Sequence, residues 1–116
     1  MRNLRRERLG TLIREEVSLI FEKELKDPRV GFVTITRVEV SQDCRFAKVF
    51  VSVLGSEEEI KETMEGLNHA LGFIRSRIAQ RLELRYVPTI AFEYDSSLAK
   101  SARVQEILKS LEEKPE

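Results

Sequence analysis

The sequence contains few of the residues that build disulfides, redox centres and metal sites. Its 116 residues include one cysteine and one histidine, and no tryptophan. The single cysteine, Cys44, excludes a disulfide within the chain and is typical of a reducing compartment. The histidine does not lie near it in sequence and there is no second cysteine, so we predict no metal site. With 7% aromatic residues, a large stacking platform for nucleobases is also excluded.

Long apolar runs are absent as well. No run approaches the roughly 18 residues of a membrane-spanning helix, and the basic start lacks the apolar segment of a secretory signal. With 41% apolar and 34% charged residues, the composition is that of a soluble globular protein. We therefore predict a cytoplasmic protein with one domain over residues 1–110 and a frayed tail over residues 111–116.

A catalytic site would need titratable side chains that converge, and the sequence offers no clear group of them. The only histidine, His69, falls in a predicted helix, far along the chain from Cys44. The glutamates at 57–59 begin a helix, where negative charge complements the helix dipole. Glycine-rich phosphate loops, CxxC pairs and HExxH motifs are absent. The sequence favours a protein without catalytic activity.

The net charge of zero is a cancellation of charged patches. Twenty basic side chains balance twenty acidic ones over the whole chain. Residues 1–14 hold five arginines against one glutamate, a local charge of +4, and residues 73–85 hold four arginines against one glutamate, a local charge of +3. Residues 57–65 carry five glutamates and one lysine. Such patches steer partners even when the total charge is zero.

The first half of the chain is predicted to form a helix and a β-hairpin. Apolar residues recur at helical spacing over residues 3–26, and Asp27-Pro28 ends the helix because proline disfavours helix at the preceding residue. Residues 31–40 are rich in β-branched side chains, and their apolar phase slips by one residue near position 36. A β-bulge or bend absorbs such a slip. Residues 46–55 alternate as the returning strand.

A second helical segment starts at a capping box, in which Ser56 caps the first amides and Glu59 reaches back. Its apolar series passes through Gly72 without losing phase, although glycine inside a helix costs about 1 kcal/mol relative to alanine. The pattern leaves open whether this is one long helix or two helices with a bend. The series comprises Ile60, Met64, Leu67, Leu71, Ile74, Ile78 and Leu82.

The remaining elements complete a two-layer domain. Residues 87–95 alternate as a third strand, and residues 101–113 predict a short amphipathic helix. Helices that cover one face of a three-stranded mixed sheet make an α+β fold.

Two arginine-rich segments supply the candidate residues for binding phosphates. Arginines at a helix N-terminus oppose the helix dipole, so helix stability does not explain those near the chain start. After Gly72, Arg77 and Arg81 project near one ridge of the helix with Ala70, and Arg75 lies on the opposite flank. Both segments suit contacts with phosphates. A solvated chain terminus and a solvated helix face remain the alternatives.

The predicted order of elements resembles a type II KH domain, a fold that binds single-stranded nucleic acid through a GXXG loop. Here the junction is His69-Ala70-Leu71-Gly72, with one glycine in place of two. The whole chain resembles the ribosome-binding factor A family, whose members carry an Ala-x-Gly kink, matched by residues 70–72. Further matching stretches are DPRVGFVTITRVEVSQD (27–43), VFVSVLG (49–55), LRYVPTIAFEYDSS (84–97) and Ser101-Ala102-Arg103.

The resemblance implies an assembly factor without enzyme activity or cofactor. It implies binding to the free 30S small ribosomal subunit and its 16S rRNA near the decoding region, support of late maturation and 5′-end processing of the precursor rRNA, and a role in cold adaptation. We expect a monomer that binds neither a membrane nor a small-molecule substrate. Ribosomal proteins are expected as further partners. Together with the charge pattern, the resemblance assigns RNA contacts to Arg2, Arg5, Arg6, Arg8, Arg75, Arg77, Arg81, Arg85 and Arg103. It assigns the helix kink to Ala70, Leu71 and Gly72.

Two other functions remain open on the sequence. A protein–protein interaction module of α+β type would use the arginines only to solubilise its surface, and it would show no salt-dependent RNA binding. An RNA-processing enzyme would turn over precursor RNA without other proteins.

Overall fold

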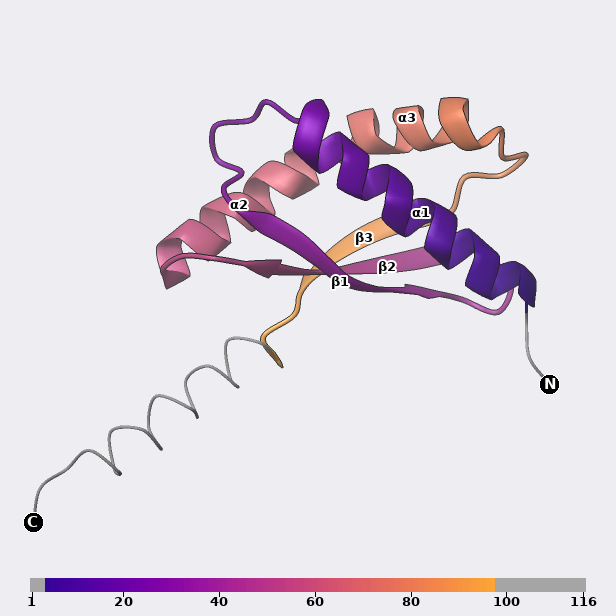
Figure 1. Ribbon diagram of the computed structural model, residues 1–116, viewed down its shortest axis with the longest axis horizontal. Coiled ribbons are helices and arrows are strands. Elements are labelled where there is room, and N and C mark those ends of the chain that lie inside the picture. The colour runs from indigo at the N-terminus through magenta and orange to yellow at the C-terminus, as the bar shows by residue number, and fades with distance from the viewer. Residues whose placement is uncertain (1–3, 98–116) are drawn as a thin grey trace, which may run out of the picture.

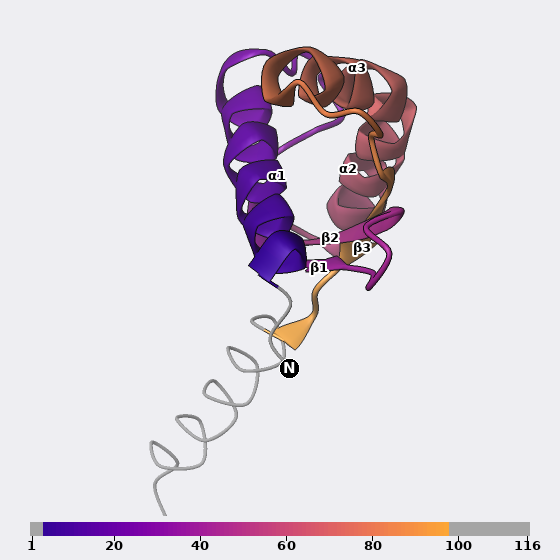
Figure 2. The same cartoon turned by 90° about the vertical axis from the view of Figure 1, so that its right-hand side faces the viewer.

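The computed structural model describes residues 4–97. Its elements follow the predicted order and form two layers, with all three helices on one face of the sheet (Figures 1 and 2). The predicted α+β class is therefore confirmed. The helix predicted over residues 101–113, the tail over 111–116, Arg2 and Arg103 lie outside the described residues.

The sheet has the order β1-β2-β3, with β1 (Val33–Val40) antiparallel to β2 (Phe46–Val53) and β2 parallel to β3 (Thr89–Tyr94). The register of the hairpin shifts between Ile35 and Arg37, which confirms the predicted slip. The extra residue, Thr36, donates its hydroxyl proton to Asp95 Oδ2 at 2.7 Å, so the bulge is tied to the end of β3.

Helix α1 (Leu4–Lys23) ends three residues before the predicted limit at residue 26. The reason is local: the amides of Glu24 and Leu25 both donate to the carbonyl of Ile20, which closes the last turn before Asp27-Pro28. One face of α1 is fully buried against the sheet and α3, through Ile13, Val17 and Ile20.

The long apolar series is divided between two helices, α2 (Glu57–His69) and α3 (Leu71–Leu82). The predicted capping box of Ser56 and Glu59 begins α2. The break lies at Ala70, where φ is −86° and ψ is 0°. Gly72 itself lies inside α3, and a Cβ added there would meet no atom within 4 Å. The bend expected over residues 70–72 is thus present, but its hinge is the buried Ala70 and not the glycine.

Gly66, in the middle of α2, is the glycine that packing requires. A Cβ built on it would lie 2.9 Å from Val30 Cγ2 and 3.3 Å from Arg29 Cβ. The segment after α1 is held against α2 at this point, where Thr63 donates its hydroxyl proton to the carbonyl of Arg29 at 3.2 Å. A side chain at Gly66 would push this segment away.

Candidate nucleic-acid interface

Two arginines that are predicted to contact RNA, Arg77 and Arg81, form ion pairs with other residues of the protein. Arg81 pairs with Glu16 of α1 and with Glu24, the first residue after α1, and Arg77 Nε lies 3.4 Å from Glu24 Oε2. These ion pairs fasten α3 to α1. Replacing both arginines by glutamate would place four carboxylates together and separate the helices, so that variant is unsuitable as a test of RNA binding.

Other basic residues meet at a cavity of about 820 Å³ between the start of α1, the β1–β2 turn and the α3–β3 loop. We call it the basic cavity. Arg5 and Arg8 come from α1, Arg45 from the turn and Arg85 from the loop. The other residues that line it are Leu9, Leu12, Asp43, Cys44, Leu84, Tyr86 and Val87.

The basic cavity has an excess of positive charge. Four arginines face one carboxylate, Asp43, a local charge of +3. A hydrogen bond from the Ser41 hydroxyl, with one from the amide of Arg45, lowers the pKa of Asp43, so this carboxylate is ionised at neutral pH. Within residues 4–97, Arg5, Arg8 and Arg85 make no ion pair. Their charges face solvent and are available to an anion.

Two backbone positions in the left-handed region belong to the segments that form this cavity: Cys44 lines it, and Glu83 directly precedes the lining residue Leu84. Cys44 has φ of 60° in the β1–β2 turn, and Glu83 has φ of 49° at the C-cap of α3. Both conformations favour glycine, and each costs a residue with a side chain about 1–2 kcal/mol. The turn at Glu83 carries the chain into the loop that holds Arg85, and Arg75 Nη2 braces this loop by donating to the carbonyl of Val87 at 3.4 Å. Strain of this kind is concentrated at functional sites.

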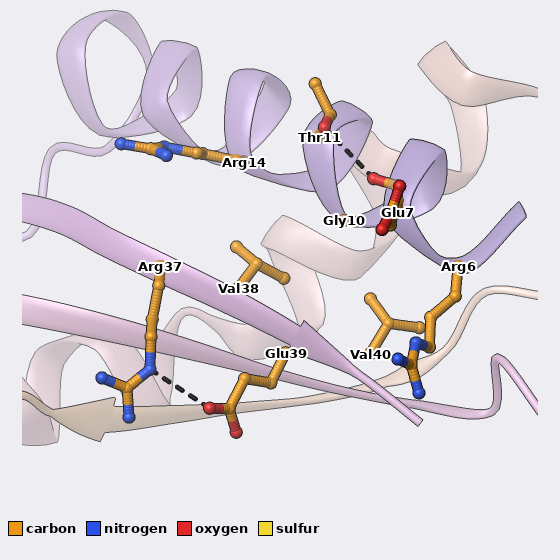
Figure 3. A pocket seen from close by; sticks show the side chains of 9 residues that line it. All are labelled: Arg6, Glu7, Gly10, Thr11, Arg14, Arg37, Val38, Glu39 and Val40. Carbon is orange, nitrogen blue, oxygen red and sulfur yellow. Dashed lines mark hydrogen bonds and ion pairs between the residues drawn. The ribbon is translucent and has the colours of Figure 1, made fainter. Parts of the chain in front are cut away.

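A second cavity lies on the opposite flank of α1, against the edge strand β1 (Figure 3). It contains Arg6, and also Arg14 and Arg37 with two glutamates, a local charge of only +1. Arg37 points to the side of β1 away from α1 and pairs with Glu39 at 3.2 Å. Its guanidinium also lies 3.9 Å from the centroid of the Phe50 ring. This arginine is therefore partly neutralised, and the basic cavity is the stronger anion site.

Apart from Arg77 and Arg81, the predicted arginines that the structure describes fall into three groups. Arg5, Arg8 and Arg85 come together, whereas Arg6 lies on the other flank of α1 and Arg75 supports the loop. Sequence reasoning missed Arg45 and Tyr86. Arg45 is a single basic residue in a turn, and the resemblance gives no role to Tyr86 in the matched stretch LRYVP. Only their convergence in space identifies them.

Comparison with known proteins gives the family. The model of ribosome-binding factor A matches residues 5–108. The chain belongs to the ribosome-binding factor A family. A ribosome-binding factor A from Halothermothrix orenii is 53% identical over 116 residues, covering all of this chain and 95% of the relative. One from Dictyoglomus thermophilum is 53% identical over 108 residues, covering 92% of this chain and 90% of the relative.

Solved structures agree on the fold. A Thermotoga maritima protein determined by NMR in solution is 44% identical, with a TM-score of 0.71 over 80% of this chain and 89% of its own. The crystal structure of ribosome-binding factor A from Thermus thermophilus is 22% identical, with a TM-score of 0.67 over 77% of this chain and 94% of its own. The KH-like fold predicted from the sequence is therefore confirmed, and in this chain a break at Ala70 separates α2 from α3.

Within residues 4–97, no three His, Cys, Asp or Glu side chains are grouped so that they could hold a metal ion. No helix in this range is long and apolar enough to cross a membrane.

Proposed function

We propose that this protein is an assembly factor that binds the 30S small ribosomal subunit through its 16S rRNA, with the basic cavity as a main contact. The convergence of four arginines from three separate segments carries the proposal. Family membership supports it, as does a homology model of the Thermus thermophilus factor fitted into a cryo-EM map of that protein's complex with the 30S subunit. Phosphate contacts of this kind supply much of the affinity for RNA.

The finer parts of the proposal follow from the family. The factor would act as a monomer in the cytoplasm, without catalysis or cofactor. It would assist late maturation and 5′-end processing of the precursor rRNA, and it would support adaptation to cold. Ribosomal proteins would share its interface. The domain would extend over residues 1–110.

The predicted arginines divide into direct and supporting roles. We assign phosphate contacts to Arg5, Arg8, Arg45 and Arg85, which line the basic cavity. Arg6, with the predicted Arg2 and Arg103, would extend the contact beyond it, and Arg75 would hold the α3–β3 loop in place. Arg77 and Arg81 would act indirectly, by keeping the α1 arginines in position.

The decisive experiment compares two triple variants in co-sedimentation with small subunits over a range of salt concentrations. Arg5→Ala/Arg8→Ala/Arg85→Ala removes three charges from the basic cavity, and Lys23→Ala/Lys26→Ala/Lys61→Ala removes three exposed charges elsewhere. Each lost phosphate contact lowers the slope of log K against log[salt] by about 0.7–0.9. We expect the first variant to lose about 2–3 units of slope and the second to behave as wild type. Equal behaviour of the two variants would refute the assignment.

Cys44 provides a second readout, because it lines the basic cavity and is the only cysteine. Bound small subunits should slow its alkylation by iodoacetamide. An unchanged alkylation rate at saturating subunit concentration would place the contact on another surface. The alternative, a protein–protein interaction module, predicts binding that hardly responds to salt and persists in the arginine variant.

A further inference from the structure

We propose that the basic cavity takes one unpaired nucleotide of RNA, with its base against Tyr86 and its flanking phosphates on the surrounding arginines. This inference rests on the proposed function, since it specifies the feature of RNA that the same site recognises.

Tyr86 is unusually exposed for an aromatic residue. It is 82% exposed while lining the cavity, and its hydroxyl has no hydrogen-bond partner within residues 4–97. Its ring therefore contributes little to the core. An exposed ring beside arginines is the arrangement that stacks a nucleobase, because every base has a π-face.

The walls around Tyr86 favour the flat face of a base over a phosphate. Leu9, Leu84 and Val87 are half-buried and pack against the core, so they present fixed apolar surface to the cavity. A paired base keeps its faces covered by its neighbours in the stack and cannot use such a surface. An unpaired base can, which is why proteins recognise RNA chiefly at loops, bulges and ends.

The arginines are placed around the cavity and do not form one row. Arg5 and Arg8 lie on α1, whereas Arg45 and Arg85 lie on the turn and the loop. The phosphates before and after an unpaired nucleotide lie on either side of its base, so cations on separate walls suit them. The volume of about 820 Å³ falls within the range of about 300–1,000 Å³ typical of small-ligand sites.

The test uses two RNA hairpins that differ in one feature. One carries a single bulged 5-iodouridine, and in the other the same iodouridine is paired with adenosine. Stacking of one base contributes about 1–3 kcal/mol, which corresponds to roughly 5- to 150-fold in affinity. We expect the full chain to prefer the bulged hairpin by a factor in this range and, on irradiation, to crosslink to it at Tyr86.

Three variants separate stacking from charge. Tyr86→Ala should abolish the preference for the bulge while leaving the salt slope unchanged, and Tyr86→Phe should preserve both. Phe32→Ala is the matched control, because Phe32 is an 81% exposed aromatic that lines a different cavity. It should bind both hairpins as wild type does.

The outcomes distinguish the inference from the proposed function. Equal affinity for the two hairpins, binding to neither at low salt, or a crosslink that avoids Tyr86 overturns the nucleotide site, while binding to small subunits would still uphold the proposed function. Weaker binding of Tyr86→Ala to small subunits with an intact preference for the bulge would mean that a protein segment fills the cavity, which also overturns it. A wild-type protein that fails to bind small subunits overturns the proposed function itself.

Discussion

Arg81 of α3 lies 2.5 Å from Glu16 of α1, a partner 65 residues earlier in the chain. Glu16 is only 8% exposed, and the same guanidinium also pairs with Glu24. A carboxylate that is withdrawn from water to this extent needs a cation beside it. The pair therefore fixes the position of α1, and with it the two arginines that α1 contributes to the basic cavity.

Arg81→Ala is expected to lower the free energy of unfolding by about 1–3 kcal/mol, because it leaves Glu16 without its cation. Urea denaturation measures the change. Gln80→Ala is the control: it is an exposed position of the same helix and should stay within about 0.5 kcal/mol of wild type. Equal stability of the two variants would mean that the ion pair contributes nothing.

Gly72→Ala and Gly66→Ala are expected to change stability in opposite directions. A Cβ at Gly72 meets nothing, so alanine should raise the free energy of unfolding by up to about 1 kcal/mol through helix propensity. A Cβ at Gly66 would lie 2.9 Å from Val30 Cγ2, so alanine there should lower it by about 1–3 kcal/mol. Thermal unfolding compares the two variants directly. A shift of the same sign in both would contradict the packing assigned to Gly66.

Local signals made most of the fold predictable from the sequence. The capping box at Ser56 and the phase slip near Thr36 each depend on residues close together in the chain, and both are present. The position of the helix break was not predictable in the same way. Buried residues keep their spacing across it, from Leu67 to Ile74, so periodicity cannot locate the hinge. Glycine weakens a helix, but here the backbone leaves helical geometry at the buried Ala70.

The site was predictable only in part, because it depends on contacts between distant segments. Charge clustering identified Arg5, Arg8 and Arg85 but could not show that they share a cavity with Arg45. The same clustering could not show that Arg81 already pairs with two carboxylates, one in α1 and one just after it. A helical projection places a charge on a face of its own helix, and the tertiary fold decides what that face meets.

Acid is expected to destabilise the protein through Asp95. Hydrogen bonds from the Thr36 hydroxyl and from Ser97 lower the pKa of Asp95 from 3.8 to about 2. A depressed pKa in the folded state stabilises the fold above the unfolded pKa, and this contribution is lost as pH falls through the folded value. The loss therefore falls between about pH 4 and pH 2.

Urea midpoints measured from pH 7 to pH 2 check this expectation. Asp95→Asn should be less stable than wild type at pH 7 and should show a weaker decline over the acid range. Asp27, whose pKa the Arg29 guanidinium also lowers to about 2, accounts for part of the decline that remains. Parallel curves for wild type and Asp95→Asn would show that the bond to Thr36 does not stabilise the ionised carboxylate.

Glu83→Gly is expected to raise the free energy of unfolding by up to about 1 kcal/mol. Glu83 ends α3 with φ of 49°, and glycine occupies this region without the steric cost that a Cβ imposes. Part of the gain is offset by the greater freedom of glycine in the unfolded chain. Glu62→Gly, at an exposed position inside α2, is the control and should lower stability by about 1 kcal/mol.

Since Glu83 leads into the loop of Arg85 and Tyr86, a stabilised variant that binds small subunits less well would show that the side chain at this turn positions the loop. If Glu83→Gly were destabilised as much as Glu62→Gly, the left-handed turn would not be the conformation in solution.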